Sequence, residues 1–225
     1  MSDSARTQLN QAAQTLALEL TEPQVDQLLA YMEWLAKWNK VYNLTSLRDP
    51  AEMLTHHLID SLTAVRPLQQ HLQLLQTAHG ESTPATPLRV LDVGSGGGLP
   101  GVVLATCLPG VQVTCVDTVS KKAAFIQQVA AALRIPNLKG LHARVESIEG
   151  GFDVVTSRAF ASLVDFTTWS LKALKPGAVW MAMKGKHPSE ELAALGSAVE
   201  VFHVEPLVVP GLDVERCLVW MRVGG

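Results

Sequence analysis

Apolar side chains recur at two different periods along this chain, and the period changes near residue 88. Before that point they fall at helical spacing, from Leu9 to Leu20, from Val25 along a second segment, and after Pro50 through about Leu62. Thr21 and Gln24 have the spacing of a capping box, which predicts that the second helix begins near Thr21. Residues 1–76 are therefore expected to form an N-terminal helical region.

Beyond residue 88, short apolar runs alternate with helical segments. The runs expected to be strands are 90–93, 111–116, 138–141, 152–156 and 178–183, and helices are expected after Pro100, from Ser120 as cap, and over 162–174. This alternation predicts right-handed crossovers and a doubly wound, Rossmann-like α/β sheet. Two late runs, 199–205 and 217–223, have no helix between them and predict a terminal antiparallel hairpin at the edge of the sheet.

The composition changes again between the two parts. Residues 77–87 are rich in glycine, serine, threonine and proline, which predicts a linker. The expected organisation is thus a helical extension over 1–76, a linker over 77–87 and an α/β domain over 88–225.

The first strand of the sheet runs into a cluster of glycines, Gly94, Gly96, Gly97 and Gly98, followed by Leu99. Such a turn brings bare backbone close to a ligand at a helix N-terminus. Counted from Gly94, a dinucleotide fingerprint requires glycine at position 99, where Leu99 stands. A second frame begins at Gly96, but it lies two residues farther from the strand. The turn therefore favours S-adenosylmethionine, with a nicotinamide or flavin dinucleotide as the alternative.

Polar residues follow the other expected strands, where ligands bind in doubly wound sheets. Asp117 ends the second strand and could accept both ribose hydroxyls of an adenosine, or could cap the next helix. Residues 143–146 follow the third strand, as a pocket wall or a surface loop. Arg158 follows the fourth strand, and its guanidinium suits a carboxylate or a phosphate. Lys184 ends the fifth.

Charge and hydrophobicity limit the possible functions only loosely. The chain has 225 residues, 48% hydrophobic content and a net charge of −3, which does not mark a nucleic-acid binder. Residues 158–187 contain five basic side chains and one acidic one, a patch that suits phosphate or a solvated face. The apolar runs are too short for a membrane span and the N-terminus lacks the pattern of a secretory signal, so a cytoplasmic protein is expected.

Cysteine, histidine and aromatic residues predict packing rather than metal binding. Three cysteines without a CxxC spacing argue against a disulfide framework and a zinc site, and are interpreted as buried apolar residues. His56 and His57 are adjacent, so they point to different faces of a helix and are expected at the surface or in capping roles. Trp34, Trp38 and Tyr42 form a ridge along one helix, for which core packing is favoured over base stacking.

Several longer motifs resemble the small-subunit ribosomal RNA methyltransferase G family, formerly called glucose-inhibited division protein B. The matching segments are Leu91–Gly101, Asp117 with Lys121-Lys122 and Phe125, Arg144-Val145-Glu146, Ser157–Ala161, Lys184-Gly185, Trp38–Thr45 and His56–Leu62. This resemblance implies a class I methyltransferase fold. It also implies transfer of a methyl group from S-adenosylmethionine to N7 of one guanine in 16S ribosomal RNA of the small ribosomal subunit.

The resemblance also implies where the cofactor binds. Its contacts would fall on Gly94, Leu99, Val145, Glu146 and Arg158, and Asp117 is added from its position at the strand end. No side chain is assigned as a proton-transfer catalyst, because guanine N7 carries no proton. Arg158 and Lys184, with Lys186, are the candidates for positioning RNA or cofactor. A monomer without metal is expected.

Three other functions remain open from the sequence. An NAD(P)-dependent oxidoreductase would use the same glycine turn. A methyltransferase of this fold could act on a small molecule or a protein. A ribosome-binding factor without enzymatic activity could retain the fold.

Overall fold

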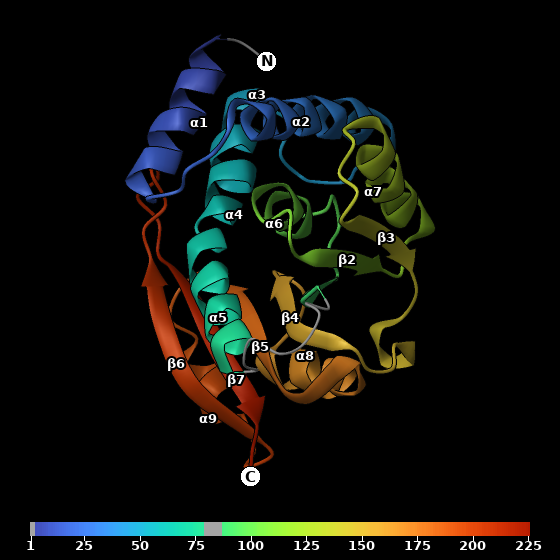
Figure 1. Cartoon of the computed structure of the whole chain (residues 1–225), viewed down its shortest axis with the longest axis vertical. Coiled ribbons are helices and arrows are strands. Elements are labelled where there is room, and N and C mark those ends of the chain that lie inside the picture. Colours follow the sequence, from blue (N-terminus) through green and yellow to red (C-terminus); the bar gives the residue numbers. More distant parts are fainter. Residues whose placement is uncertain (1–2, 79–86) are drawn as a thin grey trace.

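A computed structural model, which describes residues 3–78 and 87–225, contains a seven-stranded sheet with helices on both faces (Figure 1). The strands are β1 (Arg89–Val93), β2 (Gln112–Asp117), β3 (Leu138–His142), β4 (Phe152–Arg158), β5 (Leu174–Lys184), β6 (Val199–Leu207) and β7 (Arg216–Val223). Their order is β3-β2-β1-β4-β5-β7-β6, and β1 to β5 are parallel. The order reverses between β1 and β4, which confirms the doubly wound sheet.

The terminal hairpin is also confirmed, with one detail that the sequence did not predict. β6 and β7 pair antiparallel, but β7 lies between β5 and β6, so that only β6 occupies the edge. Arg216, the first residue of β7, is thereby brought beside the end of β5, because Cys217 pairs with Lys184.

Some of the described helices precede the sheet in the chain, up to Ala78, and the others lie between its strands. They are α1 (Asp3–Thr15), α2 (Glu22–Tyr42), α3 (Pro50–Met53), α4 (Asp60–Leu62), α5 (Val65–Ala78), α6 (Gly101–Cys107), α7 (Ser120–Ala132), α8 (Leu163–Ser170) and α9 (Ser189–Ala193), with a π-helix over Leu54–Ile59 and 3₁₀ turns over Val145–Ser147 and Leu171–Ala173. In Figure 1, α2 crosses the top of the view, and α4 and α5 descend from it beside the sheet.

Alternate strand residues enter two separate cores. Val90 and Val154 belong to a large core that also contains α1, α2, α5, α6 and α7, whereas Leu91 and Val155 belong to a smaller core with α8. This alternation is the period expected of a strand buried on both faces. The helices before residue 79 therefore share one core with the sheet. The linker expected over 77–87 falls mostly on residues 79–86, which lie outside the described part of the chain.

The expected first helix was too long. α1 ends at Thr15, because Ala17 adopts a left-handed φ of 51° and Leu18 donates back to the Ala13 carbonyl over 2.9 Å. That bond satisfies a carbonyl at the end of the helix, as in a Schellman motif. Leu20 follows the helix instead of continuing its apolar face.

The capping box of α2 is confirmed, since Thr21 and Gln24 exchange both expected hydrogen bonds. The single helix expected after Pro50 is instead α3, the π-helix and α4 in succession. π-helical turns are rare and are enriched at functional sites. This one places His56, His57 and Asp60 around one pocket.

One helix cap and one helix end differ from the prediction. Ser120 is the first residue of α7 and Val119 precedes it as the cap residue, with its N–H bonded to Asp117. The helix expected over 162–174 is α8 followed by the 3₁₀ turn over Leu171–Ala173, and Ser162 caps α8 through Asp165. The Ser162 hydroxyl accepts the Asp165 N–H, as an N-cap does, and this sets the start of α8.

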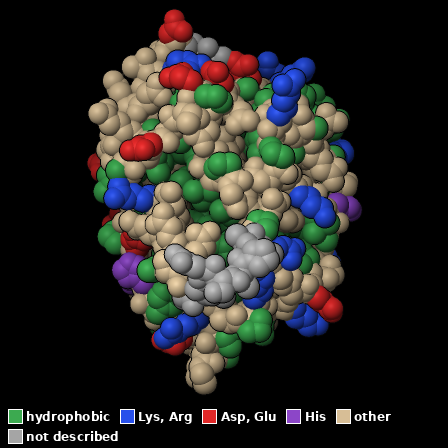
Figure 2. Space-filling view, viewed as in Figure 1, with side chains coloured by type: hydrophobic (Ala, Val, Ile, Leu, Met, Phe, Trp, Pro, Cys, Tyr) green, Lys and Arg blue, Asp and Glu red, His purple; other side chains and the backbone are tan. Residues whose placement is uncertain are grey.

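The surface is unevenly charged. Figure 2 shows acidic side chains gathered over α1 and α2 at the top of the view, where Arg6 pairs with Glu22 and Asp26.

Cys115 and Cys217 are buried and Cys107 is half-buried, which confirms the packing role expected of the cysteines. None of the described helices combines the length and apolar character that a bilayer crossing requires.

Candidate functional site

Two neighbouring pockets open at the carboxyl ends of β1, β2 and β4. The first pocket is lined by residues that include His57, Asp60, Gly94, Leu99, Arg158 and Arg216. The second is lined by residues that include Gly94, Asp117, Val145, Glu146 and Phe160. Gly94 and Ala159 line both pockets. The site residues expected from the sequence therefore lie together, in the place where ligands bind in such sheets.

The glycine turn lines the first pocket, and its first residue, Gly94, also lines the second. Gly94 adopts a φ of 65°, which L side chains rarely adopt, and a Cβ there would overlap the Phe160 ring. The Tyr31 hydroxyl of α2 donates to the Gly97 carbonyl over 2.7 Å, and Leu35 packs against the same glycine. The N-terminal helices thus contact the turn directly at Gly97, and Phe160 leaves no space for a side chain at Gly94.

Leu99 lies at the end of this turn. It is buried, lines the first pocket and donates its N–H to the Ser95 carbonyl over 3.1 Å. At the position where a dinucleotide fingerprint has glycine, the structure therefore places an apolar side chain inside the site.

Asp117 contributes a carboxylate to the second pocket. One oxygen accepts the Gly96 N–H over 3.0 Å and the other accepts the Val119 N–H over 2.8 Å. The Lys122 ammonium lies 3.7 Å away. Asp117 therefore supports both the glycine turn and the start of α7, and each oxygen retains a lone pair for another donor.

Val145 and Glu146 also line the second pocket, together with Asp117. Both lie in the 3₁₀ turn after β3, where Val145 is buried and Glu146 accepts a hydrogen bond of 2.7 Å from Arg144. That bond lowers the pKa of Glu146 from its usual value. Glu146 is therefore a carboxylate at neutral pH, and this segment is a pocket wall as well as a loop.

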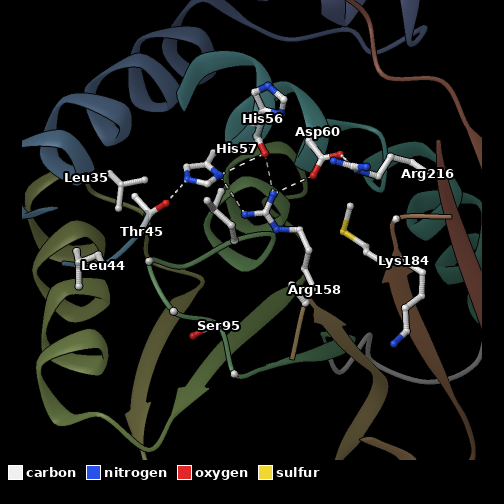
Figure 3. A pocket seen from close by; sticks show the side chains of 17 residues that line it. Leu35, Leu44, Thr45, His56, His57, Asp60, Ser95, Arg158, Lys184 and Arg216 are labelled. Atoms are coloured by element: carbon white, nitrogen blue, oxygen red, sulfur yellow. Dashed lines mark hydrogen bonds and ion pairs between the residues drawn. The ribbon is translucent and has the colours of Figure 1, made fainter. Parts of the chain in front are cut away.

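Arg158 lies in the first pocket and is already engaged on one side (Figure 3). One nitrogen of its guanidinium donates to Asp60 over 2.9 Å and to the His56 carbonyl over 3.1 Å, and another lies 3.4 Å from His57. Asp60 also accepts a hydrogen bond of 2.8 Å from Arg216. One carboxylate thus holds two guanidinium groups, which leaves a surplus positive charge at the pocket.

His57 corrects the expectation that the histidine pair has surface or capping roles. Its ring lies 2.6 Å from the Thr45 hydroxyl and faces the Arg158 guanidinium (Figure 3). Burial, and then the charge of Arg158, lower the pKa of His57 to about 4. His57 is therefore neutral at pH 7 and acts as a hydrogen-bonding wall of the pocket.

Lys184, expected as a candidate for positioning RNA or cofactor, lines the first pocket but already has partners within the protein. Its ammonium donates to Glu191 over 2.8 Å and to the Ala161 carbonyl over 3.0 Å, and Figure 3 shows it directed away from the arginine cluster. The pairing neutralises its charge. Lys186, two residues later in the chain, is exposed.

Asp92 is a buried carboxyl group beneath the glycine turn that the sequence did not single out as a site residue. One oxygen accepts the Gly101 N–H over 2.8 Å, while the other has no hydrogen-bond partner among the described residues. Burial raises the pKa of Asp92 to about 7.

The described part of the chain contains no group of three metal-binding side chains.

Comparison with known proteins gives a consistent result over nearly the whole chain. Residues 24–219 match the GidB family model, described as rRNA small subunit methyltransferase G. The chain is 59% identical over 220 residues to the ribosomal RNA small subunit methyltransferase G of Paracidovorax citrulli, covering 98% of this chain and 90% of that protein. The same-named protein of Polaromonas sp. JS666 is 63% identical over 214 residues, covering 95% and 92%.

Solved structures support the fold. A SAM-dependent methyltransferase from Aquifex aeolicus superposes with a TM-score of 0.53 at 16% identity, covering 80% of this chain and 97% of that one. The glycopeptide N-methyltransferase MtfA, solved with sinefungin, superposes with a TM-score of 0.52 at 13% identity, covering 61% and 81%. At these identities the likeness concerns the arrangement of the sheet and its helices, which is that of class I methyltransferases.

Proposed function

Because this chain belongs to the ribosomal RNA small subunit methyltransferase G family, we propose that it methylates N7 of a guanine in 16S ribosomal RNA, with S-adenosylmethionine as the methyl donor. The observation that carries this proposal is the pair of joined pockets at the switch point of the sheet. One pocket suits an adenosine and the other suits a charged amino-acid group next to a substrate base. The family membership removes the dinucleotide-dependent oxidoreductase from consideration.

The residues present fit S-adenosylmethionine. Asp117 and Glu146 offer carboxylate oxygens to ribose hydroxyls, and Val145 offers an apolar wall to an adenine ring. Gly94 lines both pockets and Leu99 lines the first, so these two residues would contact the middle of the molecule. Arg158 would hold the carboxylate of the methionine part. When bound, S-adenosylmethionine supplies an activated methyl group on a sulfonium ion.

The site's own residues have to orient and enclose the reactants. Guanine N7 has a lone pair and no hydrogen, so methylation there needs no general base. The site agrees with this requirement, since a pKa of about 4 makes His57 a weak proton acceptor, and its ring is held by Thr45 and Arg158. Orientation and exclusion of water account for catalysis in such a case. Asp60 contributes by fixing the two arginines, and Tyr31 by fixing the glycine turn.

Both pockets are built from one chain, which supports a monomer as the active form. The 16S RNA, free or within the small ribosomal subunit, is the partner, and this substrate implies a cytoplasmic location. Lys186 and the surplus charge of Arg158 and Arg216 would attract its phosphates.

Methyl transfer tests the proposal. The protein is incubated with S-adenosylmethionine carrying a tritiated methyl group, with 16S RNA, with small subunits from cells that lack this methylation, or without RNA. We expect label in the RNA of at least one of the first two samples. Binding of S-adenosylhomocysteine, measured by its effect on the melting temperature, confirms that the protein is folded. Binding without any labelled RNA would contradict the proposal.

A further inference from the structure

An aromatic side chain and a lysine lie together on the surface beside the site. Tyr42, the last residue of α2, is 41% exposed, although its ring packs on Trp38 with centroids 5.1 Å apart. The ammonium of Lys121, at the start of α7, lies 5.3 Å from the centre of the Tyr42 ring. Trp38 in turn packs on Phe125 of the large core. The ridge predicted on α2 is thus core at Trp38 and surface at Tyr42.

The charges around this ring are positive. Among the described residues, no carboxylate lies within ion-pairing distance of Lys121. Arg48 is exposed, and its one hydrogen bond within the described part of the chain goes to the neutral amide oxygen of Asn43, over 3.0 Å. The neighbouring Asp49 carboxylate accepts the N–H groups of Ala51 and Glu52 instead. We call Tyr42, Arg48 and Lys121 the rim patch.

The rim patch borders both pockets. Leu44 and Thr45, which follow Tyr42 in the same loop, line the first pocket, and Figure 3 shows the Thr45 hydroxyl directed toward His57. Lys122, which follows Lys121, lines the second pocket. A base inserted into the first pocket would therefore leave its neighbours along the strand close to this surface.

We propose that the rim patch binds a nucleotide of the RNA that flanks the methylated guanine. Its base would stack on the exposed part of the Tyr42 ring and displace the Lys121 ammonium from it, so that Lys121, together with Arg48, contacts phosphates. An exposed aromatic ring beside cations that have no carboxylate partner is the combination that binds unpaired nucleotides without reading their sequence. This inference rests on the proposed function, because it takes RNA as the substrate.

Four single variants test the rim patch. Tyr42→Ala removes the stacking surface, Tyr42→Phe keeps it, and Lys121→Gln removes one cation. Lys139→Gln is the matched control. Lys139 is exposed on β3, and it points away from α7, which carries Lys121, because its neighbour Gly140 faces α7. For each variant we measure the dissociation constant for in-vitro-transcribed 16S RNA over a range of salt concentrations. Binding of S-adenosylhomocysteine by calorimetry shows whether the cofactor site is intact.

The expected results differ between the variants. Tyr42→Ala weakens RNA binding at least about fivefold, as the loss of one stacked base does. Tyr42→Phe binds RNA as tightly as the unaltered protein does. Lys121→Gln lowers the slope of log K against log salt by about 0.7, the value for one phosphate contact to a single strand. Lys139→Gln changes neither quantity. All four variants bind S-adenosylhomocysteine as the unaltered protein does.

Other results would overturn the inference. Unchanged RNA affinity and salt slope in both Tyr42→Ala and Lys121→Gln would place the RNA elsewhere, as would an equal effect of Lys139→Gln. Equal weakening by Tyr42→Phe and Tyr42→Ala would exclude stacking. If the unaltered protein binds S-adenosylhomocysteine but methylates no RNA, the proposed function fails instead, and the two failures are therefore distinguishable.

Discussion

The Asp60 carboxylate accepts a hydrogen bond of 2.9 Å from Arg158 and is itself almost completely buried. This contact joins α4 to the end of β4, across 98 positions of the chain. Arg216 adds a second contact of 2.8 Å to the same carboxylate from β7. The N-terminal helices are therefore part of the site, because one of their residues fixes two of its arginines.

Replacing Asp60 by Asn should strongly destabilise the protein. The change leaves two guanidinium groups without their shared counter-charge, and breaking a buried ion pair from one side costs about 3–5 kcal/mol. Urea unfolding at pH 7 measures the loss. The control is Glu200→Gln, which breaks the exposed pair with Arg222 and should have a much smaller effect. Similar losses in both variants would contradict the role given to Asp60.

The stability contributed through His57 should depend on pH. Its pKa is about 4 in the folded protein, below the usual 6.5, so between these values the unfolded chain binds a proton that the folded one does not. Stability should therefore fall as the pH drops from about 6.5 towards 4. His57→Gln should flatten this decline, whereas loss of the exposed His187 should not. Melting temperatures between pH 7 and pH 4.5 test this, and an unchanged decline in His57→Gln would refute it.

Asp92 should act with the opposite sign. Its pKa of about 7 in the folded protein exceeds the usual 3.8, so the folded chain holds a proton that the unfolded chain releases between these values. The contribution of Asp92 to stability should fall as the pH rises through this range. Relative to the unaltered protein, Asp92→Asn should therefore be more favourable at pH 8 than at pH 5. A stability difference independent of pH, measured by urea unfolding, would show that Asp92 does not titrate there.

Glycine is required at position 94 but not at position 110. Gly94→Ala places a side chain at a φ of 65° against Phe160, and the backbone strain alone costs about 1–2 kcal/mol. We expect it to weaken S-adenosylhomocysteine binding at least tenfold, because the new methyl group would displace the Phe160 ring, which lines the second pocket. Gly110 has open space around it and an ordinary backbone, so Gly110→Ala should bind normally. Calorimetry compares the two, and equal affinities would show that the pockets do not share one ligand.

Much of the sheet, and the grouping of several residues of the candidate site, could be predicted from the sequence. The strands carry continuous apolar runs, and in a doubly wound sheet their carboxyl ends meet at one edge. This rule brings Gly94, Asp117 and Arg158 together without knowledge of other contacts. β7 could not be placed inside the sheet, because strand order within a hairpin at an edge is decided by packing of both faces.

The helical side of the site could not be predicted from patterns. Asp60 and Arg216 are 156 positions apart and meet only after folding, and the π-helix changes which of its residues face the pocket. Adjacent residues of a regular α-helix point to different faces, so the pattern alone gives no reason to place His57 in a pocket. Lys184 was recognised as a charge, but its partner Glu191 comes from α9, and the contact depends on how α9 packs. The matching segments Trp38–Thr45 and His56–Leu62 were the available signal for this half of the site.

The central claim is the transfer of a methyl group to guanine N7 of 16S RNA, and the chemical identity of the product tests it most directly. Unmethylated 16S RNA, free or in small subunits, is treated with the protein and S-adenosylmethionine, digested to nucleosides and analysed by mass spectrometry against synthetic standards. The account predicts N7-methylguanosine as the new nucleoside, confined to one position when the RNA is mapped. A methyl group on another atom, or no methylated RNA from protein that binds S-adenosylhomocysteine, would contradict it.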